Sequence, residues 1–247
     1  MELKICDLHM HVVPSVDDGS LNMAMSLDML MVAYEQGVRE VYCTSHNVYD
    51  KEEIDRYKAQ FMMLQLMAKS RFPDMKLHTG CELLCAGEYV DDILYGLEIG
   101  VFLPLGNSKC VLTELYSDVT PDEAKKVVTS MVGAGWKPIL AHTERYPALF
   151  DGDTISELIE LGANIQFNLY SLEEENDENL KQRARHLVEN KYAHFVGSDA
   201  HRINYRTPKY EAGVQYLIEH CEKKYVEELC YKNAENYIEQ IGSDLFG

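Results

Sequence analysis

Short apolar runs alternate with amphipathic stretches along most of the chain. The apolar runs predict strands at residues 5–11, 39–46, 75–84, 109–116, 137–143, 163–170 and 193–201. The stretches between them predict helices near residues 22–36, 52–70, 121–134, 153–162 and 177–190. Such regular alternation is typical of a parallel βα architecture, so we expect an α/β fold.

Several helix ends are marked by residues that favour a cap or a turn. Thr120 followed by Pro121 is typical of an N-cap with proline at the first helical position. Gly37, Gly135 and Gly162 each follow a helix-like stretch, where a left-handed closing residue is expected.

Two parts of the chain give weaker patterns. The segment from Gly87 to Leu94 predicts no more than a linker with a short helix. Residues 209–247 predict two or three helices. Their expected buried face consists of Tyr216, Leu217, Cys221, Val226, Leu229 and Tyr237.

Length and charge narrow the range of functions. The 247 residues fit one α/β barrel or two small domains, and the absence of a Pro/Gly/Ser-rich linker favours a single domain over residues 1–247. A net charge of −18 disfavours binding to nucleic acid or to acidic membrane surfaces. No apolar run has the length of a membrane span, and the first strand begins almost at Met1, leaving no room for a signal peptide. We therefore expect a cytoplasmic protein without membrane insertion.

The cysteines indicate reduced thiols rather than disulfides or catalysis. There are seven, an odd number, and no two form a C-x-x-C pair. None has arginine six positions later, which excludes a phosphatase with a cysteine nucleophile in a C-x5-R loop. Cys6, Cys43 and Cys81 are out of phase with nearby polar residues, so we expect them to fill space between strands and helices.

The first strand carries the most informative polar residues. Asp7, His9 and His11 alternate with apolar residues in KICDLHMHVVPSVDDGS, and alternate positions of a strand point to the same face. The loop that follows adds Asp18, and Ser20 or Asn22 can cap the next helix. A lone H-x-H is more often a pair of ordinary surface histidines, so this motif needs support from elsewhere.

That support comes from the other predicted strands, because six of the seven end in a side chain able to bind metal. The carboxyl ends of parallel barrel strands open on one face, so these side chains should meet in one cleft. Individually, each could be a satisfied core residue, and His78, His186, His194 and His220 are best interpreted that way. The candidate ligands are His9, His11, Asp18, His46, Glu82, Glu114, His142, Asp199 and His201.

So many nitrogen and oxygen ligands without thiolate indicate two or three ions, with Mn favoured over Fe and Zn. Ions held close together promote in-line displacement at phosphorus, since one generates hydroxide and the others hold the phosphoryl oxygens. Arg145 and Arg206 follow two of the ligands closely and can bind phosphate bidentately. For Arg39 and Arg202, simple surface exposure is nearly as good an interpretation.

These residues carry a family resemblance. The elements D-L-H-M-H-x-x-P-x-x-D-D-G-S, T-S-H (44–46), G-C-E (80–82), T-E-L (113–115), H-T-E-R-Y (142–146) and S-D-A-H (198–201) resemble the polymerase and histidinol phosphatase (PHP) superfamily. More narrowly, D-D-G-S and H-T-E-R-Y resemble the bacterial protein-tyrosine phosphatases of capsular and exopolysaccharide loci. The resemblance extends from the first strand to about Pro208 and implies a distorted (β/α)7 TIM-like barrel with three metals at the C-terminal strand ends.

Carried over by position, the resemblance implies three ligand sets and a group of catalytic residues. One ion is expected on His9, His11, Glu82 and Asp199, a second on Glu82, Glu114 and His142, and a third on Asp18, His46 and His201. Arg145, Arg206 and Asp18 are the expected catalytic residues, with the arginines clamping phosphate. The acidic segment 173–178 departs from the family pattern, so substrate preference stays open.

The function that these features predict is metal-dependent hydrolysis of phosphotyrosine on a protein. The resemblance implies that the substrate is the tail of a tyrosine kinase that regulates capsule synthesis. Two alternatives share the ligands: a small-molecule phosphatase of the histidinol-phosphate type and a non-catalytic metal-binding scaffold. The acidic charge disfavours a third, a polymerase-associated exonuclease.

Overall fold

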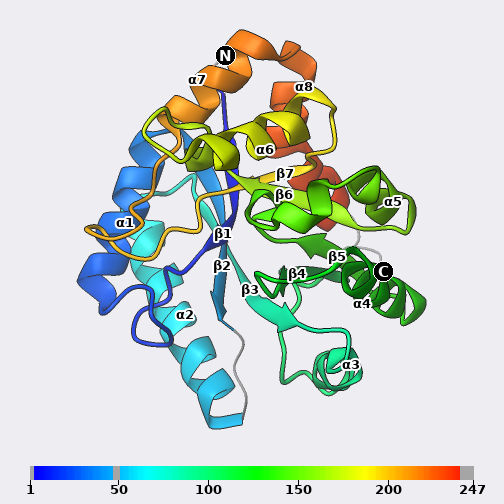
Figure 1. Cartoon of the computed structure of the whole chain (residues 1–247). Coiled ribbons are helices and arrows are strands. Elements are labelled where there is room, and N and C mark those ends of the chain that lie inside the picture. Colours follow the sequence, from blue (N-terminus) through cyan, green and yellow to red (C-terminus); the bar gives the residue numbers. More distant parts are fainter. Residues whose placement is uncertain (1–2, 47–50, 240–247) are drawn as a thin grey trace.

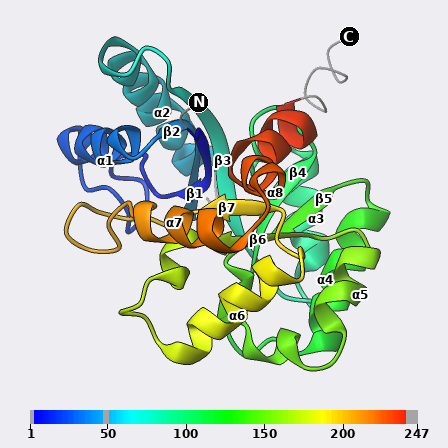
Figure 2. The same ribbon diagram turned by 90° about the horizontal axis from the view of Figure 1, so that it is seen from above.

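Seven parallel strands stand side by side in chain order in the computed structural model, which describes residues 3–46 and 51–239. Helices flank them on the outside (Figures 1 and 2). The strands are β1 (Ile5–Met10), β2 (Val38–His46), β3 (Lys76–Cys85), β4 (Cys110–Leu115), β5 (Lys137–Leu140), β6 (Asn164–Asn168) and β7 (Phe195–Gly197). The helices are α1 (Met23–Glu35), α2 (Lys51–Arg71), α3 (Val90–Glu98), α4 (Pro121–Gly133), α5 (Thr154–Glu160), α6 (Glu178–Glu189), α7 (Glu211–His220) and α8 (Lys223–Glu227).

The first and last strands meet and close the sheet into a barrel. Beyond β7, the Asp199 N–H donates to the His9 carbonyl at 2.7 Å, and the His11 N–H donates to the Ala200 carbonyl at 2.9 Å. Met10 and Ala200 form a parallel bridge at this seam. The predicted (β/α)7 barrel is therefore confirmed, and the seam lies beside the residues expected to bind metal.

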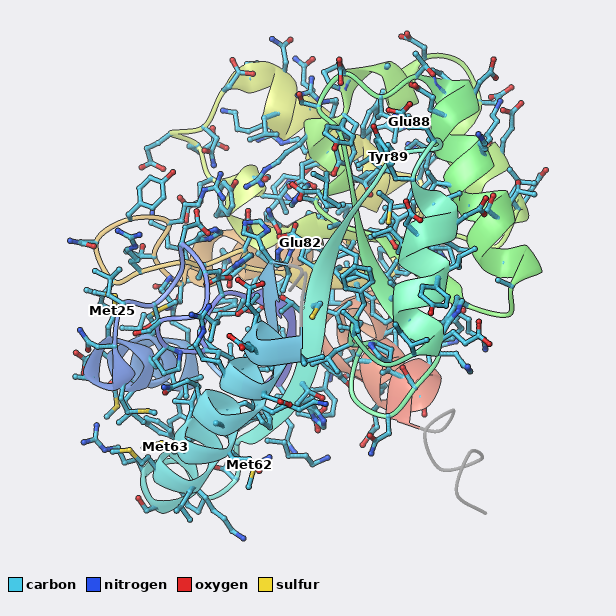
Figure 3. All side chains as sticks on the ribbon, turned by 90° about the horizontal axis from the view of Figure 1, so that it is seen from below. Met25, Met62, Met63, Glu82, Glu88 and Tyr89 are labelled. Carbon is cyan, nitrogen blue, oxygen red and sulfur yellow. The ribbon has the colours of Figure 1, made fainter. Side chains whose placement is uncertain are left out.

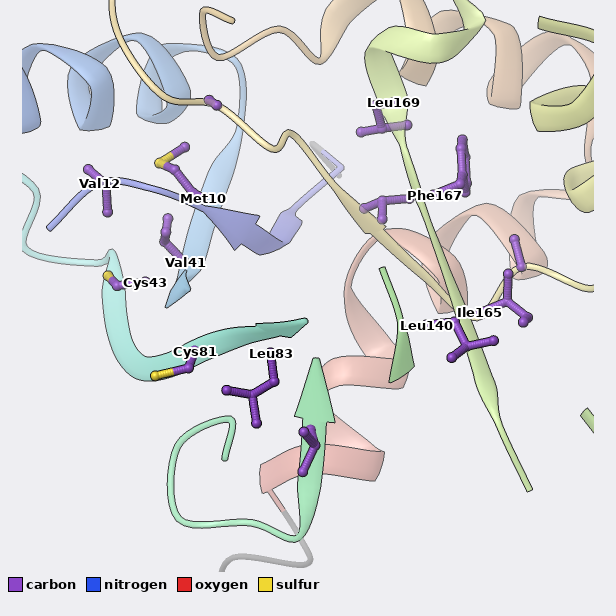
Figure 4. Packing of buried hydrophobic residues seen from close by; sticks show 14 of the residues in the cluster. Met10, Val12, Val41, Cys43, Cys81, Leu83, Leu140, Ile165, Phe167 and Leu169 are labelled. Atoms are coloured by element: carbon purple, nitrogen blue, oxygen red, sulfur yellow. The ribbon is translucent and has the colours of Figure 1, made fainter. Parts of the chain in front are cut away.

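Neighbouring residues of a strand alternate between two hydrophobic clusters. Val111 and Leu140 belong to the larger cluster, which also includes residues of the surrounding helices. Figure 4 shows Leu140 with residues of this cluster from other strands. Leu112 and Ile139 belong to the smaller one, together with Ile238 near the end of the described chain. Because side chains alternate along a strand, the smaller cluster lies on the inner face of the barrel.

The predicted helix ends are confirmed. The Asn22 side chain accepts from the Met25 N–H at the start of α1. Thr120 caps α4 in a reciprocal arrangement with Glu123, which satisfies two backbone donors at once. The glycines that follow α1, α4 and α5 have positive φ, which is 105° at Gly162. Residues with a side chain adopt this conformation only at an energetic cost.

An irregularity in β1 contradicts two predictions. The ladder between β1 and β2 shifts register between Asp7 and Met10, so alternation fails there. Asp7 does not join His9 and instead accepts hydrogen bonds from Ser198 and Tyr210. Cys6 consequently lies in the smaller, inner cluster rather than between strands and helices.

For the other two cysteines the prediction is confirmed, because Cys43 and Cys81 both lie in the larger cluster. Figure 4 shows them on neighbouring strands. None of the seven cysteines, all of which lie in the described ranges, forms a disulfide.

The C-terminal region is helical as predicted, but its buried face differs. After α8 the chain continues in π-helical turns at Glu228–Lys232 and Glu235–Glu239. Each such turn inserts a residue and rotates the face that follows, so Ile238 is buried where the pattern predicted Tyr237. Leu217, Val226 and Leu229 are buried as predicted, whereas Tyr216, Cys221 and Tyr237 are only partly buried, and residues 240–247 of the predicted tail lie outside the described residues.

No helix in the described ranges combines the length and the apolar character needed to cross a membrane.

Tyr57 of α2 gives a test of the core. Its buried hydroxyl donates to the Cys43 carbonyl at 2.5 Å and accepts from the Gly80 N–H at 3.2 Å. Tyr57→Phe removes a hydrogen-bond partner from each of these two buried backbone groups, so the free energy of unfolding should fall by about 1 to 3 kcal/mol in urea denaturation. The control is Tyr34→Phe, whose hydroxyl bonds the exposed Asp74, with an expected change within about 0.5 kcal/mol. Equal losses in the two variants would contradict the proposed role of Tyr57.

Candidate metal centre

The candidate ligands gather around the carboxyl ends of the strands. His46 ends β2 and stands opposite Glu82 of β3 in the ladder between these strands. Figure 3 shows Glu82 near the middle of the molecule, whereas Glu88 and Tyr89 farther along the chain lie at the start of α3. The strand order thus brings residues distant in sequence to one place.

β5 and β7 end before the ligands that the sequence placed at their ends. His142 follows β5, and Asp199 and His201 follow β7, so the predicted strands 137–143 and 193–201 extend too far. The reason lies in the backbone, because His142 and Asp199 have left-handed φ values of 31° and 49°. This conformation ends the extended chain and redirects the side chains.

Glu82 is the centre of the group and is only 1% exposed. Its Oε2 lies 3.2 Å from ring nitrogens of His9, His11 and His46, and its Oε1 lies 2.9 Å from His142 Nε2. Burial by itself raises the pKa of this carboxyl, but the surrounding histidines outweigh burial and hold it well below its usual value. Glu82 is therefore an anion that contacts four imidazoles.

His9 of β1 and His11, just after β1, bring their ring nitrogens together. Their Nε2 atoms are 3.1 Å apart, and Asp199 Oδ1 lies 3.6 Å from one and 3.5 Å from the other. Burial raises the pKa of Asp199, but the opposing effect of His9 and Arg145 is larger and lowers it below the usual value. The carboxyl group therefore stays ionised. Two imidazole nitrogens and a carboxylate oxygen that converge in this way are a ligand set for a cation.

A second part of the site lies around Asp18. Its Oδ1 is 3.5 Å from His46 Nε2 and 3.6 Å from His201 Nε2. The His201 ring stacks on His11 with centroids 4.0 Å apart. Burial and the neighbouring His11 lower the pKa of His201 to about 4, which leaves a neutral imidazole able to bind metal.

Glu114 joins the group through His142. Its Oε1 lies 3.6 Å from His142 Nε2, while the Tyr146 hydroxyl contacts the other ring nitrogen, Nδ1, at 3.2 Å. Burial lowers the pKa of His142, but the bonds with Glu114 and Glu82 outweigh this and raise it to about 9. The orientation of the ring is fixed from both sides.

The donor set fits divalent ions. Within the described residues, ligand atoms lie within 4.8 Å of one another in four overlapping groups that together include all nine predicted ligands. The nitrogens and carboxylates suit borderline or hard ions, and no cysteine takes part. The groups are His11, Asp18, His46 and His201; His9, His11 and Asp199; His9, Glu82 and His142; and His46, Glu82 and Glu114.

These groups differ from the carried-over ligand sets in several memberships. His11 also lies with Asp18 and its partners, and His9 lies with Glu82 and His142. Glu114 lies with His46 and Glu82 but shares no group with His142. Strand positions cannot reveal such sharing, because it depends on where the side chains lie in space.

Sequence reasoning missed Asp17, which orders the first loop. Its Oδ2 lies 2.8 Å from His11 Nδ1 and accepts from the His46 N–H at 3.0 Å, and its Oδ1 accepts from the Gly19 N–H. Although burial opposes it, bonding with His11 lowers the pKa of Asp17 to about 2. Gly19 is required here, because a Cβ would lie 2.3 Å from the His11 carbonyl oxygen. The doubled aspartate of D-D-G-S was the available signal.

Arg202 is more than a surface charge. Its guanidinium donates to the Asp18 carbonyl at 2.8 and 3.1 Å and to the Gly19 carbonyl at 3.1 Å. It therefore fixes the loop that presents Asp18. Arg39 lies over the Tyr34 ring and pairs with Asp74, away from the candidate ligands.

Both predicted phosphate-binding arginines form ion pairs with Asp199. Arg145 Nη2 is 2.6 Å from Asp199 Oδ2, and Arg206 Nη1 is 3.4 Å from the same oxygen. The Arg206 side chain is 40% exposed, so a ligand can reach it from solvent. Its backbone has a left-handed φ of 47°. Two cations beside the ligand groups are the arrangement expected for phosphate recognition.

Comparisons with known proteins agree with this site. The family model described as capsular polysaccharide synthesis, CpsB/CapC, matches residues 5–239. Tyrosine-protein phosphatase CpsB from Streptococcus agalactiae serotype V is 29% identical over 241 residues, covering 94% of this chain and 97% of that protein. Tyrosine-protein phosphatase YwqE from Bacillus subtilis (strain 168) is 30% identical over 236 residues, covering 93% and 89%.

Solved structures give the same result. One from the work on YwqE of Bacillus subtilis and CpsB of Streptococcus pneumoniae, described as unique metal-dependent tyrosine phosphatases, superposes with a TM-score of 0.76 at 26% identity. It covers 94% of this chain and 93% of that one. An amidohydrolase from Mycoplasma synoviae, at 14% identity and a TM-score of 0.60, shares the fold and covers 96% and 88%. The resemblance inferred from the sequence motifs is confirmed, and the chain belongs to the CpsB/CapC family of capsular polysaccharide synthesis.

Proposed function

We propose that this protein hydrolyses phosphotyrosine on protein substrates with the help of bound divalent metal ions. The observation that carries the proposal is the convergence of nine nitrogen and oxygen ligands around the buried carboxylate of Glu82. The names of the relatives support the substrate class, because CpsB and YwqE are tyrosine-protein phosphatases. A cysteine nucleophile is excluded, since no C-x5-R loop exists.

The ligand groups support two or three ions, with Mn favoured over Fe and Zn. We assign one ion to His9, His11, Glu82 and Asp199, a second to Glu82, Glu114 and His142, and a third to Asp18, His46 and His201. When bound, such ions supply a strong nucleophile from water at neutral pH and stabilise charge on phosphoryl oxygens.

The residues of the chain orient the substrate. Arg145 and Arg206 bind the phosphate and stabilise the negative charge that grows in the transition state. Asp18, whose side chain is 62% exposed, lies between the candidate metal ligands and solvent, where a substrate enters. Because the tyrosine phenol has an ordinary pKa near 10, departure of tyrosinate needs less help from a general acid than an alkoxide would.

A bacterial tyrosine kinase that controls capsule or exopolysaccharide synthesis is the proposed partner, with its phosphorylated tail as substrate. The family description supports a role in capsule synthesis. We place the reaction in the cytoplasm, where such a tail is accessible.

Metal dependence and substrate class can be tested together. Purified protein reconstituted with Mn, Fe or Zn should carry more than one ion per chain by elemental analysis. Phosphotyrosine peptides should be cleaved, a chelator should abolish cleavage, and thiol alkylation should not. Faster turnover of histidinol phosphate than of any phosphotyrosine peptide would favour the small-molecule alternative.

Glu82→Gln tests the centre of the site. The substitution keeps the size of the side chain but removes the charge shared by four histidines, so metal content and activity should fall together. Glu88→Gln is the matched control, because Glu88 is exposed on the segment that follows β3. Retention of the full metal content by the Glu82 variant would refute its assignment to two ions.

Replacing the arginines should separate substrate binding from metal binding. Arg145→Ala or Arg206→Ala removes a charge-assisted bond to phosphate worth about 1.5 to 3 kcal/mol. The kcat/KM for phosphotyrosine peptide should fall about tenfold to a hundredfold, with unchanged metal content. Arg56→Ala on α2, 52% exposed, serves as the control. Parental kcat/KM in both site variants would show that these arginines are ordinary surface charges.

A further inference from the structure

Tyr170 lies beside the candidate metal centre but belongs to none of the ligand groups. It occupies a 3-10 turn, Leu169–Leu172, which follows β6. The Tyr170 hydroxyl accepts a hydrogen bond from Arg145 Nη2, the nitrogen that also pairs with Asp199. The Arg145 guanidinium is therefore held at two points, one charged and one neutral.

The two contacts differ in how much of the positive charge of Arg145 remains available to a substrate. Asp199 is an anion, so it neutralises the guanidinium and competes with phosphate for it. A hydroxyl that accepts a hydrogen bond orients the guanidinium without cancelling its charge. Tyr170 thus directs the cation while preserving its charge for an anionic ligand.

We propose that Tyr170 is a positioning residue for Arg145 and that its hydroxyl holds the guanidinium in the orientation that binds the substrate phosphate. This inference rests on the proposed function and extends it to a residue outside the ligand set. The ring of Tyr170 also lies beside the guanidinium, with 5.9 Å between its centroid and Arg145 Cζ.

A buried carboxylate joins the turns that carry the two residues. Glu144 precedes Arg145 and is fully buried. Its Oε1 accepts from the Asn168 N–H at 3.1 Å and from the Ser171 hydroxyl at 2.7 Å, on either side of Tyr170. Glu144 therefore ties the turn that carries Arg145 to residues on both sides of Tyr170.

The acidic segment 173–178 supports the turn from the other side. The Asn176 amide donates to the Tyr170 carbonyl. Glu173 pairs with Lys209 at 3.0 Å, and Glu174 pairs with Arg185 at 3.0 Å. Because these acids already have cationic partners, we assign the segment to support of the turn rather than to substrate contact.

A double-mutant cycle on the metal-loaded full chain tests the proposal. Tyr170→Phe removes one oxygen from a half-buried ring, and kcat/KM for phosphotyrosine peptide should fall about fivefold to tenfold with unchanged metal content. In the Arg145→Ala background, the same substitution should change kcat/KM by less than about twofold, since its partner is gone. Equal effects of Tyr170→Phe in the two backgrounds would overturn the proposal, as would parental kcat/KM in the single variant.

The matched control is Tyr205→Phe. The Tyr205 ring lies beside the other arginine, with 5.8 Å between its centroid and Arg206 Cζ, and it is 57% exposed. Its substitution should leave kcat/KM within about twofold of the parental value. A loss equal to that of Tyr170→Phe would show that any tyrosine on this rim contributes, which would refute a specific role for Tyr170.

Binding of inorganic phosphate distinguishes failure of this proposal from failure of the proposed function. Calorimetry on the metal-loaded protein should give a Kd about threefold to tenfold higher for Tyr170→Phe than for the parent, and no further change in the Arg145→Ala background. If the parent does not cleave phosphotyrosine peptide, the proposed function fails, yet this phosphate measurement still tests Tyr170. An unchanged Kd in the single variant would overturn the positioning role.

Discussion

A buried negative charge is the constraint around which this protein is built. Glu82 is nearly inaccessible to water, and an unpaired carboxylate in such a place would be strongly disfavoured. Four histidines from three other strands and their loops contact it within 3.2 Å. These histidines come from β1, from β2 and from the segments that follow β1 and β5, so the full set reaches Glu82 only when those strands take their places in the sheet with β3.

The loops at this end of the barrel hold strained conformations that the rest of the chain largely avoids. Among the described non-glycine residues with positive φ, three of five are His142, Asp199 and Arg206, all at the site. Such conformations cost about 1 to 3 kcal/mol each and persist where surrounding contacts enforce them. At His142 the supporting contact comes from Gln166 of β6, whose side-chain oxygen accepts from the His142 N–H at 2.7 Å. β6 itself carries no candidate ligand. β6 thus supports a ligand instead of supplying one.

Regular periodicity made most of the fold and site predictable from the sequence. Alternation in strands and the shared face of a parallel barrel pointed to eight of the nine candidate ligands, and the loop after the first strand added Asp18. Capping residues located the starts of α1 and α4. The errors occurred where periodicity breaks: at the irregularity that turns Asp7 away from His9, and at the π-helical turns before Ile238. Contacts across the cleft, such as Asp17 with His11, depend on tertiary geometry that sequence spacing does not encode.

Net charge also proves a poor guide to the surroundings of the cleft. At −18, the chain as a whole repels anions, yet the proposed function requires a phosphate ester to reach Arg145 and Arg206. The acids nearest in sequence to Tyr170 are engaged with cations, as Glu173 is with Lys209 and Glu174 with Arg185. Exposed pairs of this kind add little stability. Their main effect is on local charge rather than on stability, because each pair offsets a negative charge that would otherwise repel an anion.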